Sequence, residues 1–92
     1  KMNENSEESV DTSSNITKTY GSQLRTARIA LKKSIQEVAV ELNLNVSIID
    51  AMEEMDDTRL PVSAFVIGYI RSYAKIVDLD SDALIKNYAA AD

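Results

Sequence analysis

The sequence predicts an all-α protein, a compact domain of five helices. Apolar residues recur at the three- and four-residue spacing of helices from residue 20 onward, and no segment alternates apolar and polar residues as a half-buried strand does. Signals for helix ends divide this stretch: Ser34 with Glu37 three residues later forms a capping-box pattern, and Pro61 marks a break. A length of 92 residues suits one domain with a modest core.

Each helix is expected at a definite place. The first covers about 21–32, and the second follows its cap at Ser34. The third covers about 48–56 with Ser47 as its cap, and the fourth covers about 64–77 with Ser63 as its cap. The fifth runs from a cap at Asp80 or Ser81 to about residue 90. The side chains expected to face the core are Leu24, Ala27, Leu31, Ile35, Val38, Ala39, Leu42, Ile48, Ile49, Met52, Val66, Ile70, Tyr73, Val77, Leu84, Ile85 and Tyr88.

The chain divides into an arm, residues 1–19, and a domain, residues 20–92. The arm is rich in Ser, Asn, Glu and Thr and holds almost nothing that could be buried, so it is expected to be disordered. Residues 1–20 hold four acids and two bases, whereas the whole chain has a net charge of −5, so the domain itself is only mildly acidic.

The composition removes several classes of function. With no Cys and no His, the chain lacks disulfides, thiol chemistry and the commonest metal and haem ligands. No pattern groups the carboxylates in an apolar cleft. We therefore expect that the protein is not an enzyme and that it binds no cofactor, metal or small-molecule substrate. The longest apolar run, residues 64–70, is far shorter than the ~20 residues that span a bilayer. Contact with a membrane would therefore come only through a transmembrane helix beyond this chain.

The second and third predicted helices fit a helix-turn-helix. Ala39 is small, as the close crossing of the two helices requires, and Asn43 stands at the turn, where a left-handed backbone is needed. Five apolar residues fall where the two helices must share a core: Val38, Leu42, Leu44, Ile49 and Met52. This arrangement is typical of repressor-type DNA-binding domains, but a fold alone does not establish a function.

The expected DNA-reading helix is unusually acidic. Residues 46–57 carry five acids and no base, and the acids are Asp50, Glu53, Glu54, Asp56 and Asp57. Acidic groups near phosphates oppose binding, so nucleic acid is not the expected partner. A sequence-specific DNA-binding regulator remains the alternative function. The exposed face of the third helix would consist of Asn45, Ser47, Asp50, Ala51 and Glu54. The residues expected to contact DNA are Asn45 and Ser47 on this helix, Gln36 on the second helix and Arg25 on the first.

A basic strip on the first helix is the other feature that could serve DNA. Arg25, Arg28 and Lys32 lie within about 60° of one another on a helical wheel. We favour a solvated face with one structural ion pair over a phosphate-binding strip. Arg28 and Glu53 are expected to form that pair and to join the first helix to the third.

The fourth predicted helix has more apolar surface than one buried face requires, with an apolar arc about 200° wide. Phe65 and Tyr69, one turn apart, lie beside the core-facing stripe rather than within it. Two interpretations remain open. Either the fifth helix and the arm cover the excess, or the two rings form an exposed anchor for a partner.

Residues 21–88 resemble the cytoplasmic domain of the RodZ family, bacterial inner-membrane proteins that link the actin-like MreB filament to the cell-shape machinery. The segments LRTAR, LP and GYIRSYAKIVDLD carry the resemblance. It implies a five-helix domain related to repressor-type folds and used for protein binding in the cytoplasm, with a transmembrane helix further along the protein. It also implies that Phe65 and Tyr69 touch MreB, and we expect Ile76 and Ser72, on the same side of the helix, to complete the contact set.

Three positions depart from the family pattern. Lys32 stands where relatives often have a helix-ending glycine, and Lys33 stands where they often have an apolar residue. Both bear on the turn between the first two helices. Ile67 stands where a basic residue can occur, and it bears on the edge of the partner surface.

Overall fold

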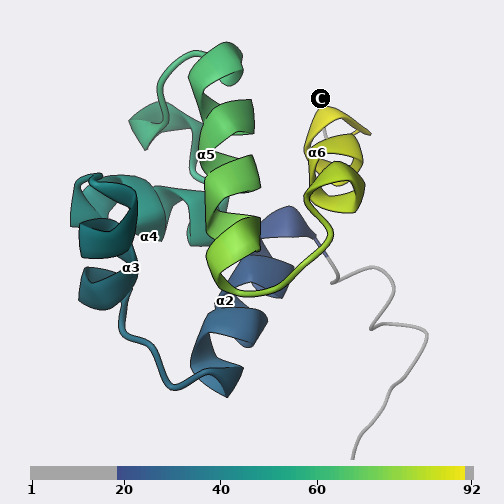
Figure 1. Cartoon of the computed structure of the whole chain (residues 1–92). Helices are drawn as coiled ribbons and strands as arrows, with labels where there is room; N and C mark the ends of the chain where they lie inside the picture. Colours follow the sequence, from purple (N-terminus) through teal and green to yellow (C-terminus); the bar gives the residue numbers. More distant parts are fainter. Residues whose placement is uncertain (1–18, 91–92) are drawn as a thin grey trace, which may run out of the picture.

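The computed structural model describes residues 19–90, which form five α-helices and one short 3-10 helix (Figure 1). The elements are α2 (Tyr20–Ala30), α3 (Ile35–Leu42), α4 (Val46–Glu54), η2 (Asp57–Arg59), α5 (Ser63–Ile76) and α6 (Ser81–Ala90). No strand occurs in this part of the chain, so the predicted all-α, five-helix class is confirmed. Thr19, assigned to the arm, is the N-cap of α2, and the rest of the predicted arm lies outside the described residues.

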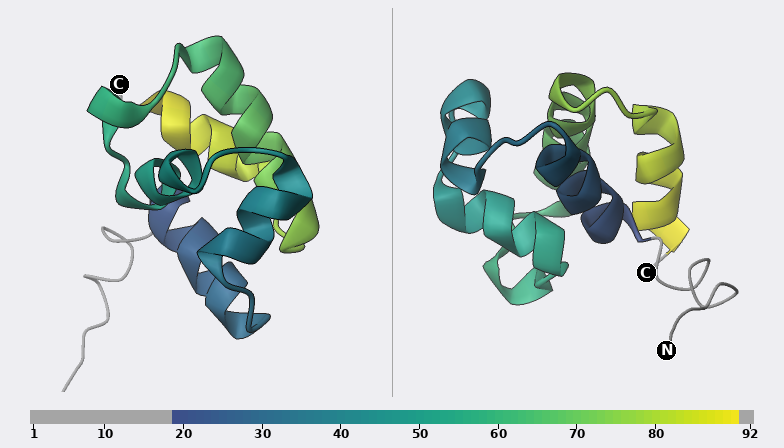
Figure 2. Two further views of the ribbon diagram at one scale, coloured as in Figure 1. Left: turned by 90° about the vertical axis from the view of Figure 1, so that its left-hand side faces the viewer. Right: turned by 90° about the horizontal axis from the view of Figure 1, so that it is seen from below.

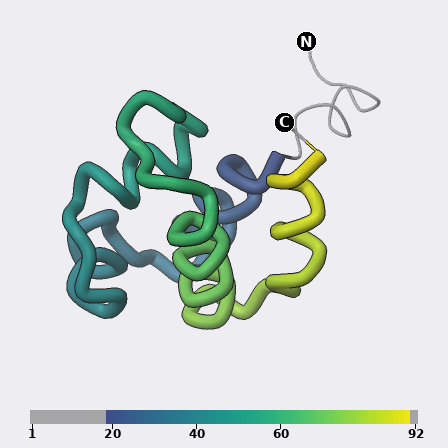
Figure 3. Tube along the Cα trace, turned by 90° about the horizontal axis from the view of Figure 1, so that it is seen from above, coloured from purple at the N-terminus to yellow at the C-terminus, as the bar shows by residue number. Residues whose placement is uncertain are grey.

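Helix α5 is the central element of the domain. It lies between the α3–α4 pair on one side and α6 on the other, as views from the front and from above agree (Figures 1 and 3). Helix α2 contacts both α4 and α6 (Figure 2). It therefore connects the two sides of the domain independently of α5. The backbone N–H of Tyr20 donates to Asn87 Oδ1 at 2.7 Å, which ties the start of α2 to α6.

The core contains most of the side chains that the helical periodicity selects. All four residues predicted for α5 are buried, which are Val66, Ile70, Tyr73 and Val77. The prediction that Leu31 faces the core is wrong, because α2 ends at Ala30 and the Leu31 side chain is 49% exposed at the helix cap. Tyr20, Ala51 and Ala74 are buried and were not predicted.

Two of the four predicted serine or aspartate caps are correct. Ser34 and Glu37 exchange hydrogen bonds in a capping box, and the Asp80 carboxylate accepts from the N–H of Asp82 at 3.0 Å. Ser47 and Ser63 are not caps, because extended backbone at Asn45 and Val62 starts α4 and α5 earlier. Neither of those N-cap residues makes a side-chain capping bond.

The turns that end the helices use left-handed residues other than glycine. Asn43, at φ 57°, takes the left-handed conformation predicted for the helix-turn-helix turn. Lys32, at φ 58°, takes the same conformation after α2, where relatives often have a glycine. The N–H of Lys33 then donates to the Arg28 carbonyl at 3.1 Å. The lysine therefore keeps the turn but bears the steric cost of a Cβ in left-handed backbone.

Gly21 marks the closest approach between helices and was not singled out by the sequence. A Cβ at this position would lie 2.5 Å from the Glu53 carbonyl oxygen and 2.7 Å from the Met52 carbonyl oxygen. Both obstacles are backbone atoms of α4, which cannot swing aside as a side chain can. A glycine is therefore needed for α2 to rest on α4.

Candidate functional site

A buried polar network joins α2, α4 and α5. Arg28 donates from Nε to Glu53 Oε2 at 2.7 Å and from Nη2 to Glu53 Oε1 at 3.0 Å, so the predicted ion pair is confirmed. A third guanidinium bond reaches the Lys33 carbonyl at 2.8 Å, and the Tyr73 hydroxyl donates to Glu53 Oε2. All three side chains are buried, so the network fixes α5 against the other two helices.

The protonation of this network follows from its geometry. The hydrogen bond to Glu53 raises the pKa of Arg28 further, so the guanidinium stays charged. Burial, and then the hydrogen bond to Glu53, raise the pKa of Tyr73 well above its usual value, so the phenol keeps its proton and acts as a donor. The protonated phenol therefore satisfies a further lone pair of the carboxylate that also accepts from the guanidinium.

The outer surface of α5 is open to solvent. Its exposed residues are Ser63, Ala64, Phe65, Gly68, Arg71, Ser72 and Lys75. At 100° per residue all of them except Ser63, the first residue of the helix, span an arc of roughly 120°, with Gly68 near its centre. Phe65 stands at one edge of this arc and Arg71 at the other, so the open face is centred beside the predicted pair of Phe65 and Tyr69 rather than on it.

The predicted contact residues differ in accessibility. Phe65 is 59% exposed and Ser72 is exposed, whereas Tyr69 and Ile76 are half-buried and pack against the core. The Phe65 and Tyr69 rings stack, with centroids 6.5 Å apart and planes 17° from parallel. Both rings are thus accessible in part, which the anchor interpretation requires, but Tyr69 and Ile76 also serve the fold.

The sequence did not predict that Val62 would enlarge this apolar surface. Its side chain is 66% exposed and directly precedes α5. Val62, Phe65 and Tyr69 follow one another at spacings of three and four residues, which is the signal that could have identified the group. We call these three residues the apolar edge.

The residues of the alternative, DNA-binding function are all exposed. Gln36 lies in the first turn of α3, Asn45 and Ser47 lie at the start of α4, and Arg25 lies on α2. Ala51 was placed on the same exposed face, but it is fully buried, because its side of α4 turns into the domain.

Although residues 46–57 contain no base, three of their five acids, Asp50, Glu53 and Asp56, pair with arginines from outside the segment. Arg59 folds back from η2, donating to Asp50 at 3.0 Å and to Asp56 at 2.8 Å. Hydrogen bonds from Thr58 and then from Arg59 lower the pKa of Asp56. Of the five acids, only Glu54 and Asp57 make no ion pair within residues 19–90. Arg59 escaped prediction because it lies just beyond the acidic segment.

Two other kinds of site can be tested on the described residues. Between residues 19 and 90, no group of three or more acidic side chains comes together in a way that could hold a metal ion. None of the helices in this range is both long and apolar enough to cross a bilayer.

A comparison with models of protein families gives a match. Residues 23–84 match a family model described as a helix-turn-helix domain, from within α2 to within α6. No solved structure matches the chain. The match confirms a helix-turn-helix domain, a fold that serves both nucleic-acid and protein binding. Within it, α3 and α4 are joined by the left-handed turn at Asn43 that the sequence predicts for the motif.

Proposed function

We propose, from the premise that this chain belongs to the helix-turn-helix domain family, that its domain is a protein-binding adaptor. The observation that carries the proposal is the apolar edge, where Val62 is 66% exposed and Phe65 is 59% exposed on one end of α5. Adjoining large apolar side chains on a small soluble domain are typical of interaction sites.

The resemblance to the RodZ family supplies the partner in this proposal. The domain would bind the actin-like MreB filament through α5 and link it to the membrane-bound cell-shape machinery from the cytoplasmic side of the inner membrane. Phe65 and Tyr69 are the anchors, with Ser72 and Ile76 beside them. The exposure of Phe65 and Ser72 and the partial exposure of Tyr69 and Ile76 support this set.

The surroundings of α5 suit an anchor. Its inner face is fully buried, and Tyr73 ties it to Glu53, so the helix is held in one position. A ring that projects from a fixed helix loses little further conformational entropy on binding. Aromatic side chains at the centre of an interface commonly contribute ~2 kcal/mol or more by alanine substitution.

The test compares Phe65→Ala with Ile29→Ala, which removes another large apolar side chain that is 54% exposed, on α2. Co-sedimentation with MreB filaments should weaken by about thirtyfold for Phe65→Ala, which corresponds to ~2 kcal/mol, and little for Ile29→Ala. Melting temperatures should stay near that of the parent in both. Failure of the parent domain to sediment, or equal losses in the two variants, would contradict the proposal.

A DNA-binding regulator is the second candidate. It is favoured by the helix-turn-helix match and by the exposure of Gln36, Asn45, Ser47 and Arg25. Against it stand Glu54 and Asp57, whose unpaired charges would repel phosphates. We expect weak, sequence-independent binding in a salt series with duplex DNA. A footprint at physiological salt that is lost in Gln36→Ala would replace the adaptor proposal with this one.

A further inference from the structure

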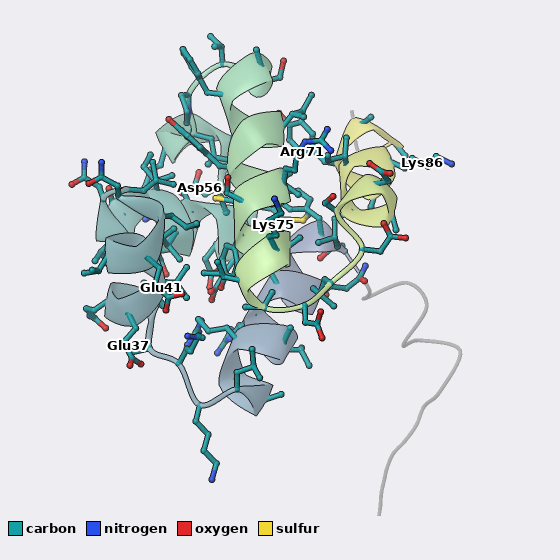
Figure 4. The ribbon with its side chains drawn as sticks, in the orientation of Figure 1. Glu37, Glu41, Asp56, Arg71, Lys75 and Lys86 are labelled. Carbon is teal, nitrogen blue, oxygen red and sulfur yellow. The ribbon has the colours of Figure 1, made fainter. Side chains whose placement is uncertain are left out.

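The outer face of α5 has a second edge, opposite the apolar edge, formed by Arg71 and Lys75. We call these two residues the basic edge. They lie roughly 80–120° around the helix from Phe65, with Gly68 and Ser72 between. Arg71 is on the side of α5 toward α6, and Lys75 points outward (Figure 4). The face that carries the proposed anchor therefore also carries two cations.

Both cations are available to an incoming group. Arg71 pairs with Asp82 at 3.5 Å, but both side chains are well exposed, and such pairs contribute little. Lys75 makes no ion pair within residues 19–90. Arg71, Lys75, Leu79 and Ser81 line a hollow of about 260 Å³. A carboxylate entering it would meet two cations and a hydroxyl.

Gly68 separates the two edges and has no role that the fold explains. A Cβ there would meet nothing within 4 Å, and its backbone is ordinary helix. A glycine inside a helix destabilises it, because the unfolded chain gains freedom. On this face, the missing side chain lets another surface come close to the backbone between the apolar and basic edges.

We propose that α5 recognises a bipartite surface on its protein partner: an apolar patch that covers the apolar edge, and a carboxylate that binds the basic edge in the hollow beside it. This inference rests on the proposed function and adds the charge that the partner must carry. The apolar edge provides area, whereas the basic edge makes the docking directional. A partner surface that lacks the carboxylate would be bound more weakly and in more than one orientation.

The charges nearby favour a single carboxylate over a nucleic acid. Arg71, Lys75 and Lys86 are matched in number by Asp78, Asp80 and Asp82 at the turn and at the start of α6. A polyanion needs a broad basic surface, because its affinity comes from many phosphate contacts. One carboxylate needs only a pair of donors at the right place.

The experiment compares Lys75→Glu with Lys86→Glu in filament co-sedimentation. Both are exposed lysines on helices and undergo the same change in charge, but Lys86 projects from α6 away from α5 (Figure 4). Lys75→Glu should weaken binding about tenfold at low salt and flatten its salt dependence, whereas Lys86→Glu should change it by about twofold at most. Lys75→Gln should give an intermediate loss, and all three should melt near the parent.

Several outcomes would overturn the inference. Equal losses in Lys75→Glu and Lys86→Glu would do so, as would filament binding that does not depend on salt. Loss of binding in Phe65→Ala with full binding in Lys75→Glu would remove this inference and leave the proposed function standing. If the parent does not bind filaments, both fail. If Lys75→Glu instead weakens binding to duplex DNA, the basic edge serves a nucleic acid.

Discussion

Gly21 and Gly68, the two glycines of the chain, stand in opposite surroundings. Gly21 is pressed against two carbonyl oxygens of α4, beside the network of Arg28, Glu53 and Tyr73. Gly68 faces open space on α5. The first glycine is explained by the fold and the second is not. The contact of α2 with α4 thus holds the domain together, and the outer face of α5 is the part left for another molecule.

The largest expected effect comes from breaking the buried network. Glu53→Ala leaves the Arg28 charge and the Tyr73 hydroxyl buried without their acceptor. The free energy of unfolding should fall by about 3–5 kcal/mol, measured by urea denaturation followed by circular dichroism. The control removes all three polar groups together, as Arg28→Met, Glu53→Met and Tyr73→Phe, and should lose less. A larger loss in the triple variant would mean that the polar network itself is the source of stability.

Gly21→Ala should have the next largest effect. The added Cβ meets backbone oxygens of Met52 and Glu53, so α2 must shift away from α4. Overpacking of this kind costs about 1–3 kcal/mol, which thermal unfolding would measure. An unchanged melting temperature would show that the two helices are not packed as closely as described.

Gly68→Ala is the matched opposite, since the same methyl group enters open space. Stability should rise by about 0.5–1 kcal/mol through lower entropy of the unfolded chain. For a domain of this size that is an increase of about 3–6 °C in melting temperature. If a partner approaches Gly68 closely, filament binding should weaken while stability rises. A simultaneous gain in both would show that nothing packs against this position.

The smallest effect concerns the exposed cluster of Asp56, Thr58 and Arg59. Because the folded-state pKa of Asp56 lies below its ordinary value of 3.8, its carboxylate stabilises the fold above that pH and stops doing so as pH falls through the folded-state pKa. Asp56→Asn should therefore lower the melting temperature slightly near neutral pH. At a pH low enough to protonate Asp56, the variant and the parent should melt together. If the two melting temperatures still differ at that pH, the effect comes from the change in side-chain structure and not from the lost charge.

Helical periodicity predicted the core because it depends on spacing alone, and the buried faces of α3 and α5 agree with it. The capping box at Ser34 was predictable because both of its bonds close within three residues. Ser47 and Ser63 were misassigned because the start of each helix depends on the backbone of the preceding residue, which the packing of the turn decides. The same serine signal thus succeeded where the interaction is local and failed where it is not.

The candidate site was predictable only in part. Phe65 and Tyr69 could be placed one turn apart beside the core stripe, but their exposure depends on how neighbouring helices pack. The pairing of Arg59 with Asp50 crosses nine residues and needs the fold of η2. The open space around Gly68 has no signal in the sequence beyond the glycine itself.

Four turns within residues 19–90 use left-handed residues that are not glycine, namely Lys32, Asn43, Met55 and Asp78. Each bears a steric cost of about 1–2 kcal/mol in the folded state, with Asn and Asp at the lower end. Each also removes backbone freedom that a glycine would give the unfolded chain. The two effects oppose each other, so the net gain from glycine should be greatest where the residue type tolerates left-handed backbone least. Lys32 is an exposed position of this kind, and a redesign for heat resistance would start there and leave Asn43 unchanged.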